Sequence, residues 1–192
     1  MKKLTILVDM DDTIENLCEA WVAELNRRHG THVVAANIRE WEMARSFPEL
    51  TVEQIYAPLT SEAFWHTVKP IDGAVSALSK LRDDGHRVVI VTASHHDTVS
   101  YKLNLVLFKY FPFLSYFDVI IASQKDLITG DVMIDDNPFN FDHTKASERL
   151  NILFTAPHNM NFDAEKAGFY RADTWKDVLT YVDFYSYLKT TM

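Results

Sequence analysis

The sequence predicts an α/β fold: a doubly wound, mostly parallel sheet with a small helical cap inserted after the first strand. Two observations predict the sheet, namely short apolar runs that do not alternate with polar residues and helical patterns between those runs. A third observation predicts the cap, because roughly 80 residues separate the first apolar run from the second, far more than a crossover needs.

The apolar runs are rich in Val and Ile and are typical of buried strands. Four of them are clear: Leu4–Val8, Val88–Val91, Val119–Ile121 and Val132–Ile134. A fifth is expected at Ile152–Phe154. Continuous apolar character indicates strands that are covered on both faces, as in a parallel sheet.

The segments between the runs have the spacing of helices. Leu17, Trp21 and Leu25 recur at every fourth residue, and Gly30 is a suitable end for that helix. Three more helices are expected: one capped by Asp72 and ended by Gly85, one from about Asp97 to Tyr110, and one beginning near Asp173.

The long interval divides the chain into a core, residues 1–14 and 70–192, and a helical cap, residues 15–69. The cap is rich in aromatic residues: Trp21, Trp41, Phe47, Tyr56, Phe64 and Trp65. Most of them are expected to pack in the interior. A cap above the sheet edge would nevertheless need some of them to face a ligand, because ligand pockets are largely apolar.

Composition excludes several classes of function. The formal charge is −8 and no run of Lys or Arg stands out, so a nucleic-acid polymer is not expected as a partner. Cys18 is the only cysteine, which allows no intramolecular disulfide and fits a reducing compartment. No apolar stretch has the length of a membrane span or a signal peptide. We therefore expect a cytoplasmic protein without membrane contact; a homodimer is compatible with the sequence.

Acidic residues directly follow the first apolar run. They are Asp9, Asp11 and Asp12, and open α/β sheets bind ligands at the carboxyl ends of their strands. Three carboxylates so close together repel one another, and a hard cation such as Mg²⁺ would offset that repulsion. The alternative is an acidic turn that caps the following helix, for which Asp12 and Thr13 would suffice.

A second acidic group, Asp135 and Asp136, follows the run Val132–Ile134. Turn chemistry alone does not explain two strands that are both followed by acidic residues. Brought together at one edge of the sheet, the two groups would form a carboxylate cage for Mg²⁺, which usually takes one or two protein carboxylates together with water and phosphate.

Two further positions suit a phosphate. Thr92 ends the second run and is followed by Ala93 and Ser94, and a hydroxyl with backbone N–H groups at a strand end can hold phosphate oxygens. Lys125 lies between the third and fourth runs. A single Lys is most often a surface charge, but acidic clusters flank this one in the fold order and a phosphate site needs a cation.

The order of these residues resembles the haloacid-dehalogenase-like (HAD) phosphohydrolases. Their pattern is Asp-x-Asp-x-Thr/Val, then Thr or Ser, then Lys, then an acidic pair, matched here by Asp9/Asp11/Thr13, Thr92, Lys125 and Asp135/Asp136. Within that superfamily, with its Rossmann-like core, the chain is most similar to the 5′(3′)-deoxyribonucleotidases. LVDMD, KPIDGA, GDVMIDD and NILFTAPHN (151–159) carry that closer resemblance.

The resemblance implies a mechanism and a substrate, a nucleoside monophosphate. Asp9 would attack phosphorus and form an aspartyl-phosphate, and Asp11 would be the general acid and base. Asp9, the backbone carbonyl of Asp11 and Asp136 would hold Mg²⁺ with support from Asp135, while Thr92 and Lys125 would bind phosphate oxygens.

The chain departs from the animal members of that family at three positions. Asp12 stands where Gly is usual, Ala93 where Ser is usual, and Leu17 where an aromatic residue lines their pocket. Ala93, Ser94 and Leu17 are therefore expected to contact the substrate. Trp41, Phe64 and Trp65 are the candidates in the cap for stacking on a base.

Three alternatives remain open at this stage. The first is a related phosphatase for sugar phosphates or another small phosphomonoester. The second is a receiver-type switch phosphorylated on Asp, although receivers lack a large insertion after the first strand and carry their acceptor on a middle strand. The third is a binding module without activity, which the full set of expected catalytic side chains disfavours.

Overall fold

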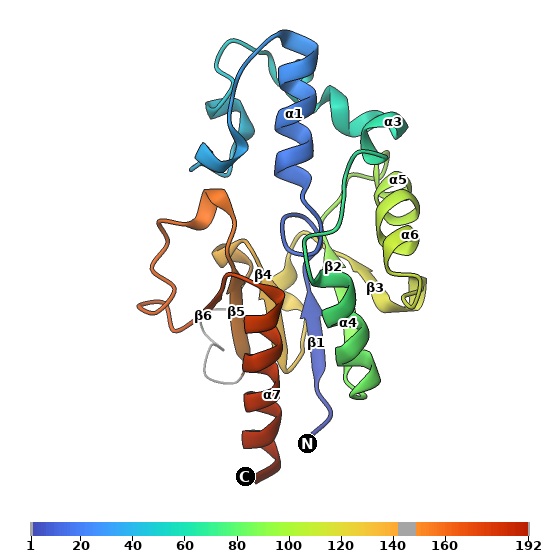
Figure 1. Cartoon of the computed structure of the whole chain (residues 1–192), viewed down its shortest axis with the longest axis vertical. Coiled ribbons are helices and arrows are strands. Elements are labelled where there is room, and N and C mark those ends of the chain that lie inside the picture. The colour runs from blue at the N-terminus through green and yellow to red at the C-terminus, as the bar shows by residue number, and fades with distance from the viewer. Residues whose placement is uncertain (1, 142–148, 192) are drawn as a thin grey trace.

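The computed structural model describes residues 2–141 and 149–191. In these residues one parallel sheet has the strand order β3-β2-β1-β4-β5-β6 (Figure 1). The strands are β1 (Thr5–Val8), β2 (Arg87–Thr92), β3 (Val119–Ile121), β4 (Val132–Asp135), β5 (Leu150–Phe154) and β6 (Tyr170–Ala172). The predicted α/β class with a parallel sheet is confirmed.

Two strands differ from the prediction. β6 was not predicted, because its three residues contain no apolar run and its middle residue is Arg171. β3 was predicted to be buried, which is wrong: it forms the edge of the sheet beside β2, and the side chain of Ile121 is 53% exposed. An apolar run does not reveal whether a strand has a neighbour on one side or on both.

The longer helices lie where the sequence predicts them. They are α1 (Leu17–His29), α4 (Ala74–Asp83), a helix over residues 99–110 and α7 (Trp175–Thr191). The third comprises α5 (Val99–Tyr101), a π-helical segment (Lys102–Leu107) and α6 (Phe108–Tyr110). Two short helices, α2 (Val52–Tyr56) and α3 (Glu62–Trp65), complete the set together with 3₁₀ turns. No helix in the described part of the chain is long and apolar enough to cross a membrane.

Gly30 ends α1 in the left-handed conformation, as predicted. The predicted cap of α4 is wrong, because Gly73 and not Asp72 occupies the N-cap position. Gly73 has φ of 79°, and an added Cβ would lie 3.4 Å from Cβ of Trp175. The close approach of α7 thus favours glycine at the start of α4.

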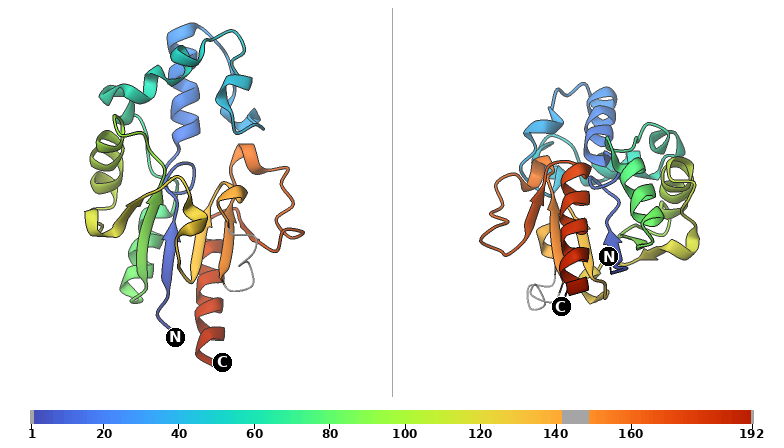
Figure 2. Two further views of the ribbon diagram at one scale, coloured as in Figure 1. Left: turned by 180° about the vertical axis from the view of Figure 1, so that it is seen from behind. Right: turned by 60° about the horizontal axis from the view of Figure 1, so that its bottom comes forward.

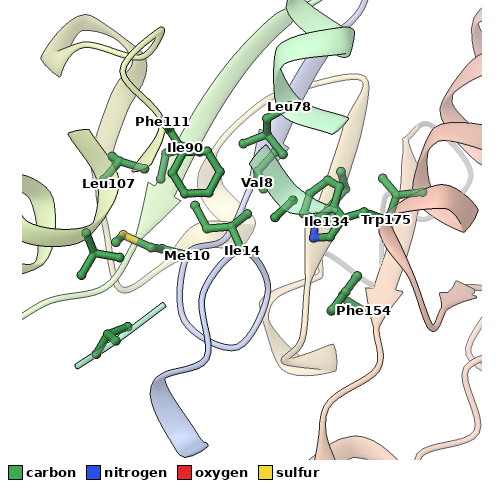
Figure 3. Close-up of a cluster of buried hydrophobic side chains, with 14 of the residues drawn as sticks. Val8, Met10, Ile14, Leu78, Ile90, Leu107, Phe111, Ile134, Phe154 and Trp175 are labelled. Atoms are coloured by element: carbon green, nitrogen blue, oxygen red, sulfur yellow. The ribbon is translucent and has the colours of Figure 1, made fainter. Parts of the chain in front are cut away.

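The two faces of the sheet have separate apolar cores. Figures 1 and 2 show α4 and α7 lying over the same face. There Val8, Ile90 and Ile134 pack with Leu78 of α4 and Trp175 of α7 (Figure 3). The opposite face carries the alternate residues, and its core is Leu7, Val89, Val91, Met133 and Leu153 with Phe141, Ala164 and Phe169.

Residues 15–69, which we call the cap segment, lie beyond the carboxyl ends of the strands (Figure 1). The chain enters and leaves this segment at one place: the backbone N–H of Asn16 donates to the Lys69 carbonyl (3.0 Å), and that of Lys69 donates to Asn16 Oδ1 (2.9 Å). Inside the segment, Trp21 Nε1 donates to the Ile55 carbonyl at 2.7 Å. That the segment forms a domain of its own stays a prediction.

One contact ties α7 to the loop after β1. The indole Nε1 of the buried Trp175 donates to the backbone carbonyl of Thr13 at 3.0 Å. Because Thr13 directly follows Asp12 in the loop that carries Asp9 and Asp11, this bond helps to hold the acidic loop against the core.

Replacement of Trp175 by Phe should destabilise the protein by about 2 kcal/mol, because a buried carbonyl loses its partner and apolar contact is lost. The measurement is the free energy of unfolding from urea titration. Tyr187→Phe, an exposed change on the same helix, is the matched control. Equal unfolding midpoints for the two variants would contradict this role.

Candidate active site

The loop after β1 is a tight turn that carries three aspartates. The backbone N–H groups of Ile14 and Glu15 both donate to the Met10 carbonyl, at 3.0 and 3.3 Å. Asp12 has φ of 50°, a left-handed conformation that Asp tolerates better than most residues. Its Oδ1 accepts the backbone N–H of Cys18 at 2.9 Å and so ties the turn to the start of α1.

Asp11 is paired with a lysine that the sequence did not single out. Nζ of Lys102 lies 2.6 Å from Asp11 Oδ2 and 2.6 Å from Thr92 Oγ1, and it also donates to the Ala93 carbonyl at 3.3 Å. Lys102 is only 1% exposed. Burial raises the pKa of the Asp11 carboxyl, but the charge and hydrogen bond of Lys102, together with Glu15 and Lys125, outweigh that effect and leave the pKa lowered.

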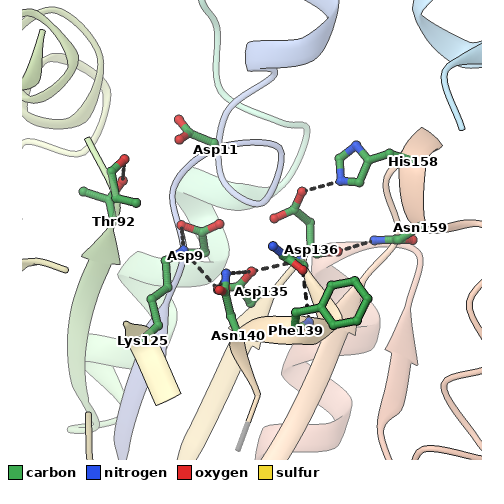
Figure 4. A network of polar contacts seen from close by, with 12 residues as sticks. Asp9, Asp11, Thr92, Lys125, Asp135, Asp136, Phe139, Asn140, His158 and Asn159 are labelled. Carbon is green, nitrogen blue, oxygen red and sulfur yellow. Dashed lines mark hydrogen bonds and ion pairs between the residues drawn. The ribbon is translucent and has the colours of Figure 1, made fainter. Parts of the chain in front are cut away.

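Lys125 joins the ends of β1 and β4. Its ammonium forms an ion pair with Asp9 and lies 3.0 Å from Asp135 Oδ2 (Figure 4). Burial lowers the pKa of Lys125, but the Asp9 and Asp135 carboxylates outweigh burial and raise it overall. The lysine therefore stays charged between two carboxylates.

The hydrogen bonds of Asp135 occupy both of its carboxylate oxygens. Oδ1 accepts the backbone N–H of Asn137 at 2.8 Å, and Nδ2 of Asn140 lies 2.9 Å from Oδ1 and 3.1 Å from Oδ2. With Lys125 on Oδ2 as well, Asp135 is placed to hold the lysine.

Asp136 differs from Asp135, because one of its oxygens stays without a partner. Oδ2 lies 2.6 Å from His158 Nε2, whereas Oδ1 is buried and has no hydrogen bond within the described residues (Figure 4). Burial, and then the charge of Asp9, raises the pKa of Asp136 well above its usual range. Burial also lowers the pKa of His158, to about 4, so burial opposes the charged form of both partners.

The donor atoms suit a hard divalent cation. Carboxylate oxygens of Asp9, Asp135 and Asp136 lie within 4.8 Å of one another. Since both oxygens of Asp135 are engaged, Asp9 and the free Oδ1 of Asp136 are the oxygens left for the cation. Oxygen donors of this kind fit Mg²⁺.

A cavity of about 500 Å³ lies between these carboxylates and the cap segment. The side of the cavity nearest the sheet is lined by Asp9, Asp11, Ala93, Lys125 and Asp136. The rest is lined by residues that include Leu17, Trp41, Tyr56 and His158. The site thus has a charged base and partly apolar walls, as expected for a ligand that is ionic at one end and aromatic at the other.

The other predicted contact residues lie elsewhere. Ser94 and Trp65 line a neighbouring cavity of about 510 Å³, which shares Asp11, Leu17 and Ala93 with the first. Phe64 is buried in the cap segment and lines neither of these two cavities. Thr92 is also buried, and Lys102 covers its hydroxyl.

Sequence reasoning missed four residues of this site, namely Lys102, Asn140, His158 and Glu15. Only His158 had a signal, because it lies in the segment 151–159 that matched without evident chemistry. Glu15 is fully buried, no N–H or hydroxyl donor of the described residues reaches its carboxyl oxygens, and its carboxyl lies close enough to that of Asp11 for the two to share a hydrogen bond. Burial, and next the Asp11 charge, raises its pKa.

Comparison with known proteins agrees with this geometry. A family described as 5′ nucleotidase, deoxy (pyrimidine), cytosolic type C matches residues 2–185. A 5′(3′)-deoxyribonucleotidase from Clostridium acetobutylicum is 30% identical over 175 residues, which cover 91% of this chain and 92% of that protein. One from Bacillus subtilis is 30% identical over 179 residues, covering 93% and 97%.

Solved structures share the fold at low sequence identity. A haloacid dehalogenase-like hydrolase from Streptococcus pneumoniae superposes with a TM-score of 0.62 at 17% identity, covering 94% of this chain and 98% of that one. A HAD family hydrolase from Deinococcus radiodurans with bound phosphate and sodium gives 0.60 at 13%, covering 94% and 95%. A HAD-type chain from Bacillus subtilis bound to magnesium gives 0.58 at 15%, covering 94% and 98%.

The pH dependence of stability tests the electrostatics of the acidic loop. Burial, with the Asp11 and Asp9 charges, raises the pKa of Asp12 to about 7, whereas an unfolded Asp titrates near ~3.9. A raised folded-state pKa stabilises the protein fully below the unfolded value, and the stabilisation is lost as pH rises through the folded value. With a chelator present, wild type should therefore lose stability between about pH 4 and pH 7.

In Asp12→Asn this part of the loss should be absent, because Asn keeps the acceptor for Cys18 but does not titrate. We expect the melting temperature of chelated wild type to fall between pH 5 and pH 7.5 by about 7 °C more than that of the variant, which corresponds to ~2.5 kcal/mol. Calorimetry at the two pH values measures the difference, and parallel decreases would contradict it.

Proposed function

We propose that this chain, which belongs to the 5′ nucleotidase, deoxy (pyrimidine), cytosolic type C family, is a Mg²⁺-dependent phosphatase of nucleoside monophosphates. Membership of that family makes it a phosphoric monoester hydrolase of the HAD type. The observation that carries the proposal is the placement of Asp9 and Asp136 at one sheet edge, with Lys125 paired to Asp9 beneath an aromatic-lined cavity.

Asp9 is the proposed nucleophile. It ends β1 at the floor of the cavity, and its ion pair with Lys125 fixes its orientation. A carboxylate oxygen of Asp9 forms a bond to phosphorus while the bond from phosphorus to the nucleoside oxygen breaks. Water then attacks the aspartyl-phosphate, which releases inorganic phosphate and restores the carboxylate.

Asp11 is the proposed general acid and base. It gives a proton to the departing nucleoside oxygen and later takes one from the attacking water. Without substrate, Lys102 keeps the pKa of Asp11 low, and Asp11 would then have no proton to give. Because Lys102 also contacts Thr92 Oγ1, a phosphate oxygen near Thr92 would share the lysine and so let the pKa of Asp11 rise.

Asp9, the backbone carbonyl of Asp11 and Asp136 would hold the cation, with Asp135 in support. Bound there, Mg²⁺ would neutralise charge on the transferring phosphoryl group. The magnesium and the phosphate with sodium found in HAD-type neighbours support a cation at this edge. Lys125 and Thr92 are proposed to bind phosphate oxygens.

The cavity walls favour a nucleotide over a sugar phosphate. Trp41, Tyr56 and Leu17 offer an aromatic and aliphatic surface within a volume of about 500 Å³. A planar base can stack on such a surface. A sugar phosphate has no base and would leave that surface exposed to water. The names of the relatives from Clostridium acetobutylicum and Bacillus subtilis support a deoxyribonucleotide.

Phosphate release from a panel of mononucleotides and sugar phosphates tests this function. We expect release from deoxynucleoside monophosphates with Mg²⁺, none with a chelator, and a loss of at least about 10³-fold in Asp9→Asn, which removes the nucleophile. Asn has the same size and tests the charge alone. Activity confined to sugar phosphates would overturn the nucleotide assignment, and a long-lived phospho-protein without turnover would indicate a switch.

Replacement of Lys102 by Met should lower kcat by about 10²-fold, because the phosphoryl group loses a buried cation. The pKa of Asp11 should rise, since burial then acts without its largest opposing charge. The pH profile of kcat should shift upward accordingly. Lys109→Met, an exposed change on the same helix, is the control, and an unshifted profile in Lys102→Met would contradict the pairing.

A further inference from the structure

The turn after β5, residues 156–159, contacts both Asp136 and the cap segment. On the side of the core, His158 Nε2 lies 2.6 Å from Asp136 Oδ2, and both side chains are buried. On the other side, the His158 ring packs edge to face against Trp41, with centroids 4.4 Å apart and an angle of 84°. Arg39 of the cap segment also reaches the Pro157 carbonyl, at 3.5 Å.

The backbone of this turn is held firmly. Asn159 Nδ2 donates to the carbonyls of Asp136 and Phe154, both at 2.7 Å, and its Oδ1 accepts the backbone N–H of Ala156 at 3.2 Å. Arg171 from β6 donates to Asn159 Oδ1 at 3.0 Å and to its carbonyl at 3.1 Å. His158 therefore projects from a fixed base, and Figure 4 shows its ring pointing to the Asp136 carboxylate.

We infer that His158 is a positioning residue: it fixes the carboxylate of Asp136 for the cation and links that carboxylate to the cap segment through Trp41. The inference rests on the proposed role of Asp136 as a metal ligand. Oδ2 is held by the imidazole, so Oδ1, which has no partner in the described residues, stays directed at the cation site. A hydrogen bond of this kind orients a ligand before the metal arrives.

The contact between Trp41 and His158 makes the position of Asp136 depend on the cap segment. Trp41 is 58% exposed and lines the cavity together with His158. A shift of the cap segment that removes Trp41 would free one face of the imidazole and loosen Asp136. Cation affinity would then depend on where the cap segment lies, even with no substrate bound.

Direct binding of Mn²⁺ without substrate, followed by the electron paramagnetic resonance of the free ion, tests this inference. His158→Asn should weaken Mn²⁺ binding about 10- to 100-fold, the usual effect of losing the partner of a metal ligand. His158→Gln should stay within about threefold of wild type, because its amide nitrogen reaches the position of Nε2, whereas that of Asn reaches only Nδ1. Equal binding by the two variants would overturn the inference.

The link to the cap segment needs its own variants. Trp41→Ala should weaken Mn²⁺ binding in wild type but add nothing in the His158→Asn background, because the indole acts through the imidazole. Tyr56→Ala removes another aromatic of the cavity that touches Trp21 and not His158, and should leave Mn²⁺ binding unchanged. Unchanged binding in Trp41→Ala, or additive losses in the double variant, would overturn the link.

The stoichiometry separates this inference from others. One ion per chain is expected in every variant that binds. A second cation could be held by carboxylate oxygens of Asp12 and Asp136 and a ring nitrogen of His158, which also lie within 4.8 Å of one another. Two ions bound by wild type and one by His158→Asn would therefore make His158 a ligand and overturn the positioning role. Wild type that binds no Mn²⁺ would overturn the proposed metal site itself, whereas normal binding by His158→Asn overturns only the present inference.

Discussion

Six carboxyl groups meet at one buried edge of this sheet, and the rest of the site depends on how their charges are balanced. They are Asp9, Asp11, Asp12, Glu15, Asp135 and Asp136. Burying a lone charge is expensive, and crowding charges of one sign adds repulsion. Two buried lysines oppose this: Lys125 lies against Asp9 and Asp135, and Lys102 against Asp11.

The sheet order makes the cluster possible. β1 has β2 on one side and β4 on the other, so the carboxyl ends of all three strands lie next to one another. Parallel pairing from Ile6 with Val132 to Val8 with Ile134 sets Asp9 level with the acidic pair of β4. The apolar cores on both faces support this geometry, because they exclude water from β1, β2 and β4, whose interior residues are apolar.

The sequence predicts those parts of the site that lie at strand ends. Asp9, Thr92, Asp135 and Asp136 each follow an apolar run, and parallel strands bring such positions to a single edge. The core strands and main helices are predictable for the same reason, since each has an apolar pattern of the right period.

Side chains that reach the edge from elsewhere have no such pattern. Lys102 lies in the π-helical segment after β2, and the direction of its side chain depends on a local backbone geometry that a single Lys in the sequence does not predict. His158 depends on a turn held by Asn159 and Arg171, which are distant from Asp136 in the sequence. The exposure of β3 likewise depends on which strands surround it.

The balance of charge also supports the proposed cation at this edge. The two lysines offset only part of this charge. The pKa is raised to about 7 for Asp12 and Asp135 and is well above the usual range for Glu15 and Asp136, with burial as the largest cause in each, so these groups bind protons more readily than exposed carboxylates do. A cation can replace those protons only where an oxygen is free to receive it. Oδ1 of Asp136 is such an oxygen, whereas those of Asp135 are engaged.

Binding of the proposed Mg²⁺ at this site would therefore exchange protons for the cation, and the affinity should rise with pH over the range in which Asp136 titrates. The same exchange would leave Asp136 ionised, and Nε2 of His158 could then donate to its carboxylate. The cation and the imidazole then stabilise the same ionised form of Asp136, so each strengthens the other. A histidine beside this aspartate is more useful than a second lysine would be, because a neutral ring orients the carboxylate without competing with the cation for its charge.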